Sequence, residues 1–153
     1  MLSITTRFIH LLLFIFSILL SSLSYSEQLA IKAGFILDVE SGEIKANQII
    51  LIDGNQIKEI TSDLPEGYKT IDLSDKYIVP GLFDMHTHLV GVLDKTYFSS
   101  LFQSPHRAMI GGIVNANKTL MAGFTSVRNV GAPDFMDVAL RNSINANEVP
   151  GPR

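Results

Sequence analysis

The stretch IVPGLFDMHTHL, residues 78–89, decides how the rest of the chain is interpreted. An apolar run leads into two histidines that are separated by one residue. In a strand over residues 82–88, side chains alternate between the two faces, so Asp84, His86 and His88 point to the same side. Imidazole nitrogens at this spacing suit zinc and neighbouring divalent metals. We therefore expect His86 and His88 to bind one metal ion.

The histidine pair also has a simpler interpretation. Histidine occurs in strands as a hydrogen-bonded residue without any ligand, and a His-x-His triplet is not specific by itself. Two features favour the metal interpretation. Pro80-Gly81 marks a chain reversal just before the strand, and the pair lies where an apolar strand ends, which is the position of ligand-bearing loops in parallel α/β folds.

Residues 1–26 have the pattern of a secretory signal peptide. Arg7 precedes an almost wholly apolar run over residues 8–20, and small residues follow, with Ser24 and Ser26 placed for cleavage after position 26. The run is shorter than the about 20 residues that span a bilayer, which favours cleavage over the alternatives, an uncleaved anchor or a buried helix. We expect a periplasmic or secreted protein with no stable membrane anchor after cleavage.

Composition limits the classes of partner and site. The chain has 153 residues, no cysteine and a formal net charge of −3. The absence of cysteine excludes a disulfide framework and any thiolate metal site. No Lys/Arg cluster is present to neutralise phosphates, so nucleic acid is not an expected partner.

Short strands separated by turns are expected over residues 27–75. The expected strands are 29–37, 48–52, 56–60 and 70–73, with a hairpin turn at 53–55 and the last strand ending before 74–76. Ile31, Ala33 and Phe35 share one face of the first strand. A small antiparallel sheet of this kind buries one face only and needs a partner layer.

A helix, a strand and a second helix are expected after the histidines and a long irregular stretch. Ser104 as N-cap and Pro105 at the first helical position predict a helix to residue 122, closed by Gly123. Its expected apolar face comprises Ala108, Met109, Ile113, Ala116, Leu120 and Met121. His106, near the helix start, is expected at the surface.

The predicted elements after this helix complete a repeated pattern. Residues 124–130 are expected to form a strand and residues 134–144 a helix, in which Phe135, Val138 and Leu140 are candidates for burial. The order strand, helix, strand, helix is typical of a parallel α/β fold with right-handed crossovers.

Three segments resemble the amidohydrolase superfamily of metal-dependent hydrolases. VPGLFDMHTH at 79–88 resembles the first barrel strand of that superfamily. AGFTSVRN at 122–129 resembles its second barrel strand, especially in the branch of imidazolonepropionase-like and Xaa-Pro dipeptidase-like enzymes. Gly-Pro-Arg at 151–153 resembles the segment that leads to the third strand. Asn129 departs from the branch, which often has aspartate at that position.

The resemblance implies an α/β fold with the N-terminal part of a (β/α)8 TIM barrel over residues 76–153, preceded by strands of a small β-sandwich over residues 27–75. In the family the paired histidines hold a divalent metal, usually zinc, that polarises the scissile carbonyl and lowers the pKa of a bound water. His86 and His88 match these ligands. The other ligands and the general base come from later strands, so no catalytic residue is expected within this chain. Asp84 is expected either near the metal or in a hydrogen bond outside the ligand set.

The function expected from this resemblance is that of the N-terminal portion of an amidohydrolase. It would hydrolyse C–N bonds of a small amide or dipeptide substrate through a metal-activated water. Two alternatives stay open. One is a non-catalytic truncated remnant or interaction fragment, and the 153-residue fragment alone is expected to be inactive in any case. The other is a different His-x-His metallohydrolase, such as a phosphoesterase, although that class typically has no sheet before the histidine strand.

Overall fold

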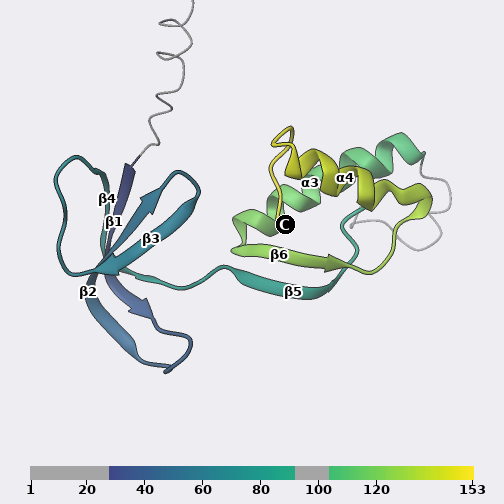
Figure 1. Cartoon of the computed structure of the whole chain (residues 1–153). Coiled ribbons are helices and arrows are strands. Elements are labelled where there is room, and N and C mark those ends of the chain that lie inside the picture. The colour runs from purple at the N-terminus through teal and green to yellow at the C-terminus, as the bar shows by residue number, and fades with distance from the viewer. Residues whose placement is uncertain (1–27, 92–103) are drawn as a thin grey trace, which may run out of the picture. The chain divides into compact units, whose positions relative to one another are not determined.

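The computed structural model describes residues 28–91 and 104–153 (Figure 1). The chain divides between Val79 and Pro80 into two compact units, called here the N-terminal unit and the C-terminal unit. The predicted signal peptide, residues 1–26, lies outside the described residues, and so does most of the irregular stretch after the histidines. Within the described ranges, no helix is long and apolar enough to cross a membrane.

The N-terminal unit contains one four-stranded sheet. Its strands are β1 (Gln28–Leu37), β2 (Ile44–Asp53), β3 (Gln56–Thr61) and β4 (Lys69–Ile78), in the spatial order β3-β2-β1-β4. The predicted hairpin is confirmed, because β2 and β3 pair antiparallel on either side of a tight turn. The expectation of a purely antiparallel sheet is wrong, because the chain crosses from β3 to the free edge of β1 and β4 then pairs with β1 in parallel.

A bulge at Gly34 lengthens β4 beyond its predicted end. Ala33 pairs with Leu73 and Phe35 pairs with Tyr77, so residues 74–76 lie opposite Gly34 alone. The predicted end of the strand before residue 74 is therefore wrong, because the bulge absorbs the three polar residues without ending the pairing. A Cβ atom at position 34 would overlap the carbonyl oxygen of Ser74, so only glycine fits there.

The bulge also changes which residues of β1 are buried. Ile36 is 7% exposed and lies with Ala33 in one apolar cluster, whereas Phe35 stacks on Tyr77 with ring centroids 4.4 Å apart. The predicted alternation of positions 31, 33 and 35 therefore fails beyond Gly34.

Both faces of this sheet carry an apolar cluster. One cluster contains Ala30, Ile49 and Leu51, and the other contains Ala33, Ile36 and Ile50. Successive residues of a strand face opposite sides, so the apolar run over residues 49–52 contributes to both clusters. The expectation that only one face is buried is wrong for this reason.

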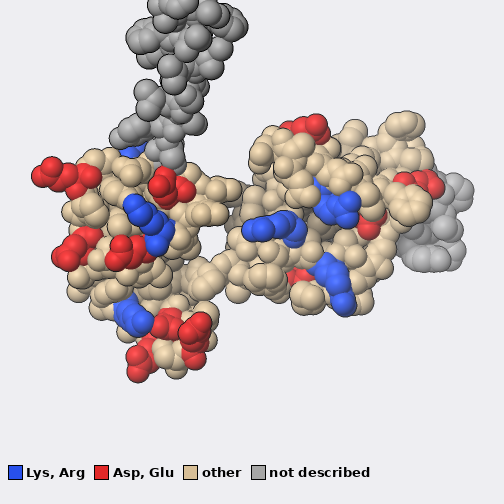
Figure 2. Space-filling view, in the orientation of Figure 1, with Lys and Arg blue, Asp and Glu red and all other residues tan. Residues whose placement is uncertain are grey.

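The turn between β1 and β2 is organised by Asp38. Its carboxylate accepts hydrogen bonds from Lys45 Nζ at 2.6 Å and from the backbone N–H groups of Glu40 and Ser41 at 3.1 and 3.3 Å. Acidic and basic side chains lie together at this end of the N-terminal unit in Figure 2. The hydrogen bond from Lys45, followed by those from Ser41 and Glu40, lowers the pKa of Asp38 from 3.8 to about 2.

We expect Lys45→Met to raise the pKa of Asp38 while leaving it below 3.8, because the two backbone donors remain. A depressed carboxyl pKa stabilises the fold above the unfolded value, and this contribution is lost as pH falls from 3.8 through about 2. An NMR titration of the Asp38 carboxyl carbon measures the shift. Lys58→Met on the exposed part of β3 is the matched control, and an equal shift in both variants would contradict the assignment.

The C-terminal unit follows the predicted strand, helix, strand, helix order. It contains β5 (Leu82–Thr87), α3 (Pro105–Met121), β6 (Phe124–Asn129), the short 3-10 helix η1 (Pro133–Phe135) and α4 (Met136–Asn145). Strands β5 and β6 pair in parallel, and both α-helices lie on one side of this pair in Figure 1. The predicted N-cap is confirmed, because Ser104 Oγ accepts the backbone N–H of Arg107 at 3.3 Å.

Two predicted core residues of this unit are instead exposed. Leu89, Ala116 and Leu140 are buried between the helices and the strands, but Met121 is 77% and Phe135 is 79% exposed. Met121 lies five positions from Ala116, or about 140° around the helix, and so leaves the packed face. Residues 134 and 135 have left-handed backbone angles, φ 51° and 54°, so α4 begins at Met136 rather than at 134.

Candidate metal centre

The two histidines lie together at the carboxyl end of β5. Their rings meet edge to face with centroids 5.6 Å apart, and both side chains are exposed. Two imidazoles on one tetrahedral ion have ring centroids about 5 Å apart. The observed separation of the two rings is close to this value, so the pair is a candidate for binding one divalent ion.

Asp84 contacts the main chain of the first histidine. Its Oδ1 accepts the backbone N–H of His86 at 3.0 Å, and the register between β5 and β6 shifts between Asp84 and Thr87. Of the two roles expected for Asp84, this contact corresponds to the hydrogen bond outside the ligand set. It fixes the backbone from which the imidazole of His86 projects.

Strand β6 holds the end of β5 through side chains as well as through the ladder. Arg128 Nε donates to the carbonyl of Met85 at 2.9 Å, and the backbone N–H of Val130 donates to the carbonyl of Thr87 at 2.9 Å. The carbonyls on either side of His86 therefore both have partners, which restricts the backbone between them.

One ring nitrogen of His88 already has a protein partner. Nδ1 lies 3.3 Å from the carbonyl oxygen of Gly131. A carbonyl can only accept, so in a neutral ring this contact places the hydrogen on Nδ1 and leaves the lone pair on Nε2. Metal-binding histidines usually donate their second ring N–H to such an acceptor, which fixes the tautomer and the ring orientation.

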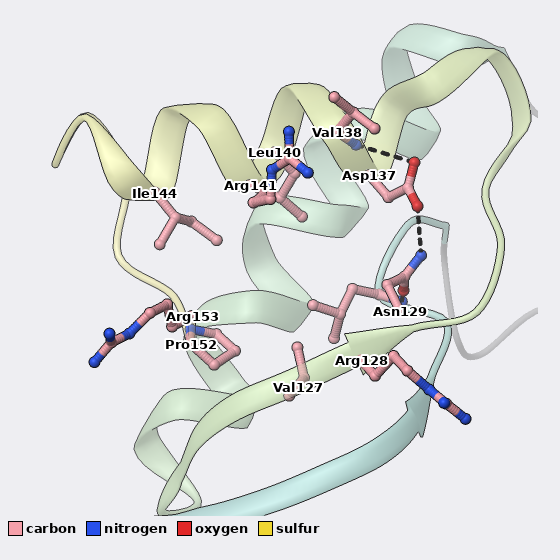
Figure 3. A pocket seen from close by; sticks show the side chains of 11 residues that line it. Val127, Arg128, Asn129, Asp137, Val138, Leu140, Arg141, Ile144, Pro152 and Arg153 are labelled. Carbon is pink, nitrogen blue, oxygen red and sulfur yellow. Dashed lines mark hydrogen bonds between the residues drawn. The ribbon is translucent and has the colours of Figure 1, made fainter.

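Asn129, at the end of β6, connects three segments around His88. Its Oδ1 accepts the backbone N–H of Leu89 at 2.8 Å, and its Nδ2 donates to the carbonyl of Gly131 at 3.1 Å and to Asp137 Oδ2 at 3.2 Å. Figure 3 shows the hydrogen bond to Asp137 and a second one from the backbone of Val138 to the same carboxylate. In the sequence Asn129 stands out only as a departure from a family pattern, and these contacts were not predicted.

Asn115 supports the chain just after His88 from the crossover helix. This side chain is 7% exposed, and its Nδ2 donates to the carbonyls of Leu89 and Gly91 at 2.8 and 3.0 Å. Asn115 was not among the residues predicted for the packed face of this helix. Asn115 shares the buried face of α3 with Gly111 and Gly112, which lie four and three residues earlier, because i,i+3 and i,i+4 neighbours share a helix face.

A cavity of about 230 Å³ lies between β6, α4 and the last residues of the chain. Figure 3 shows Asn129 and Asp137 at one end of it and Ile144 and Pro152 at the other. His86 and His88 do not line this cavity. The histidine pair is therefore a separate candidate site on the same strand pair.

Residue Arg153 pairs with β6 in the manner of a parallel strand. Its N–H donates to the carbonyl of Thr125 at 2.9 Å, and its carbonyl accepts the N–H of Val127 at 2.8 Å. One residue bonded to two residues that are two positions apart is the parallel ladder pattern.

No group of three or more His, Cys, Asp or Glu side chains that could hold a metal is found in residues 28–91 and 104–153. His106 is exposed at the start of α3, as predicted. The predicted ligands His86 and His88 would supply two of the four positions that a structural or catalytic zinc site needs, counting water.

Comparison with known families identifies the family of the chain. The model of the amidohydrolase family matches residues 77–153, just over half of the 153 residues. The chain belongs to the amidohydrolase family. The matched region of this amidohydrolase contains β5, α3, β6 and α4, and therefore both histidines and both asparagines described above.

Solved structures resemble the amidohydrolase chain over most of its length. A Xaa-Pro dipeptidase with bound methionine in its active site is 31% identical with a TM-score of 0.75, covering 82% of this chain and 32% of that chain. A prolidase complexed with N-methylphosphonate-L-proline is 30% identical with a TM-score of 0.71, covering 82% of this chain and 30% of that chain.

Curated relatives of the amidohydrolase chain are similar over shorter stretches. A dihydroorotase of Trichlorobacter lovleyi is 43% identical over 63 residues, which cover 40% of this chain and 15% of that protein. A 5'-deoxyadenosine deaminase of Methanothrix thermoacetophila is 40% identical over 60 residues, which cover 39% of this chain and 14% of that protein. The chain thus spans about a third of the length of these solved relatives and a smaller share of the length of the curated ones.

Proposed function

We propose that this chain is the N-terminal portion of a metal-dependent amidohydrolase that hydrolyses a C–N bond in a small amide or dipeptide substrate. The observation that carries the proposal is the pair of imidazoles at the end of β5, 5.6 Å apart, in a chain of this family. Its relatives, which include a Xaa-Pro dipeptidase, a prolidase and dihydroorotases, suggest the class of bond.

In the proposed site His86 and His88 hold a divalent metal, most readily zinc. A zinc ion bound in this way supplies a Lewis acid that polarises a carbonyl and lowers the pKa of a bound water. His88 would bind through Nε2, because Nδ1 faces the Gly131 carbonyl. Asp84 keeps the backbone of His86 in place through its hydrogen bond to the N–H of that residue.

We also propose how the two units belong to a larger fold. Residues 76–153 would form the first βα units of a (β/α)8 barrel, and residues 27–75 the N-terminal share of a small β-sandwich. The parallel pairing of β5 with β6, and of Arg153 with β6, supports the barrel, because each new strand adds to the same sheet in the same direction.

Export is a further part of the proposal. Residues 1–26 would be removed as a signal peptide, which places the mature protein in the periplasm or outside the cell. N-terminal sequencing of the exported protein checks this, and a first residue other than one near Glu27 would contradict the cleavage site.

Metal removal from the full-length protein tests the proposed activity. We expect hydrolysis of a panel of Xaa-Pro dipeptides and cyclic amides to stop on dialysis against a chelator and to return on addition of Zn²⁺, because the carbonyl is polarised only with the metal present. Release of free amino acid or acid from each substrate is the measurement. Turnover that survives chelation, or cleavage of phosphodiesters without any amide, would contradict the proposal.

A further inference from the structure

The ring of His88 is held by a chain of hydrogen bonds that begins on α4. Asp137, in the first turn of that helix, accepts the N–H of Val138 through Oδ1 and the amide of Asn129 through Oδ2. The carboxylate is therefore fixed by its own helix on one side and faces the amide of β6 on the other (Figure 3).

The amide of Asn129 has one orientation that satisfies all its neighbours. Oδ1 faces a donor, the N–H of Leu89, and Nδ2 faces two acceptors, the Gly131 carbonyl and the Asp137 carboxylate. A flipped amide would place N–H against N–H at Leu89 and oxygen against oxygen at both acceptors. Both hydrogens of Nδ2 are used, so the contacts also fix the amide plane.

These contacts restrict His88 from two directions. Asn129 holds the main chain immediately after His88 through the N–H of Leu89. It also holds the Gly131 carbonyl, the same oxygen that lies 3.3 Å from His88 Nδ1. The position of that oxygen decides whether Nδ1–H is bonded, and therefore which ring nitrogen offers its lone pair.

We propose that Asn129 is a positioning residue that orients the ring of His88 and fixes its tautomer through the carbonyl of Gly131. This inference rests on the proposed metal site, but the ring orientation exists in the metal-free protein and is measurable there. Loss of an outer partner of a ligating histidine typically weakens metal binding about 10-fold to 100-fold, and we expect an effect of this size for Asn129.

Three variants of the full-length protein separate the contacts. Asn129→Ala removes all three. Asn129→Asp keeps the acceptor for the Leu89 N–H but sets a carboxylate against both the Gly131 carbonyl and Asp137. The double variant Asn129→Asp, Asp137→Asn restores a donor and acceptor pair between the two positions while leaving the Gly131 carbonyl without its donor. Asn117→Ala, at an exposed position of α3, is the matched control.

Three measurements are made on each variant. Thermal unfolding reports the general effect on the fold. The ¹⁵N shifts of the His88 ring, recorded without metal at about pH 8 where ordinary imidazole is neutral, report which nitrogen carries the hydrogen. Competition for Zn²⁺ with a chelator reports affinity.

We expect Asn129→Ala and Asn129→Asp to lose the Nδ1–H preference of His88 and to weaken Zn²⁺ binding about 10-fold to 100-fold. The double variant should recover thermal stability without recovering the ring signal or the affinity, which a merely structural role of Asn129 would not produce.

Recovery of all three properties in the double variant would overturn the inference, as would an unchanged ring signal in Asn129→Ala. If Asn129→Ala does not fold, the double variant still decides. Failure of the wild-type protein to bind Zn²⁺ would overturn the proposed metal site, whereas the metal-free ring signal tests Asn129 independently.

Discussion

The double substitution His86→Ala, His88→Ala in the full-length protein is expected to abolish Zn²⁺-supported hydrolysis. Both imidazoles are exposed at the end of β5 with ring centroids 5.6 Å apart, so alanine removes both proposed ligands at once. We expect kcat/KM to fall at least about a thousandfold, equivalent to about 4 kcal/mol of transition-state stabilisation. Bound zinc per protein, measured by elemental analysis, should fall in parallel.

Stability separates this effect from unfolding. Exposed side chains away from packed contacts change the free energy of unfolding by about 0.5 kcal/mol or less, so without metal the double variant should unfold close to the temperature of the metal-free wild type. His106→Ala, at the exposed start of α3, is the control and should keep both zinc and activity. A double variant that retains stoichiometric zinc and full turnover would remove these histidines from the metal site.

The substitution Gly34→Ala is expected to cause the largest loss of stability in the N-terminal unit. The added methyl group would overlap the carbonyl oxygen of Ser74 and lie 3.1 Å from that of Lys76. Both obstacles are backbone atoms of β4 and cannot rotate away, so the strands must separate at the bulge. Overpacking typically costs about 1–3 kcal/mol. We expect a cost at or above the upper end of this range, because pairing of β1 with β4 is also disturbed.

Hydrogen–deuterium exchange of the β1 and β4 amides measures this loss. Gly42→Ala provides a matched comparison, because Gly42 has φ 76° with no atom within 4 Å of a Cβ placed there. In that variant only the left-handed backbone conformation of alanine lowers the free energy of unfolding, by about 1 kcal/mol. Equal acceleration of exchange in both variants would show that the close approach of the strands at Gly34 does not limit the sheet.

Local sequence signals predicted most of the elements of the fold. The helix N-cap at Ser104, the hairpin connection at 53–55 and the parallel order around α3 all follow from short-range chemistry and are confirmed. The bulge at Gly34 was not predictable in this way, because the reason for glycine is the carbonyl of Ser74 on a strand that is distant in sequence.

In the candidate site, too, the local features were predictable from the sequence and the contacts between distant residues were not. The spacing of His86 and His88 was sufficient to predict that the rings lie together. The partners of His88 were not predicted, because Asn129 and Gly131 approach it only after the crossover through α3 and the pairing of β6 with β5. Likewise, Asn115 is a polar residue on a packed helix face, and its role depends on two loop carbonyls that only tertiary structure brings close.

The long sequence separations of these contacts affect biosynthesis. The partner of the Leu89 N–H lies 40 residues further along the chain, and the partner of the His88 ring lies 43 residues further. At about 5–20 residues per second, the ribosome releases the histidines some seconds before it releases the residues that orient them. During that delay the imidazoles belong to a nascent chain and have no fixed geometry. The ordered arrangement needed by the proposed metal site therefore forms late, although its histidines are synthesised first.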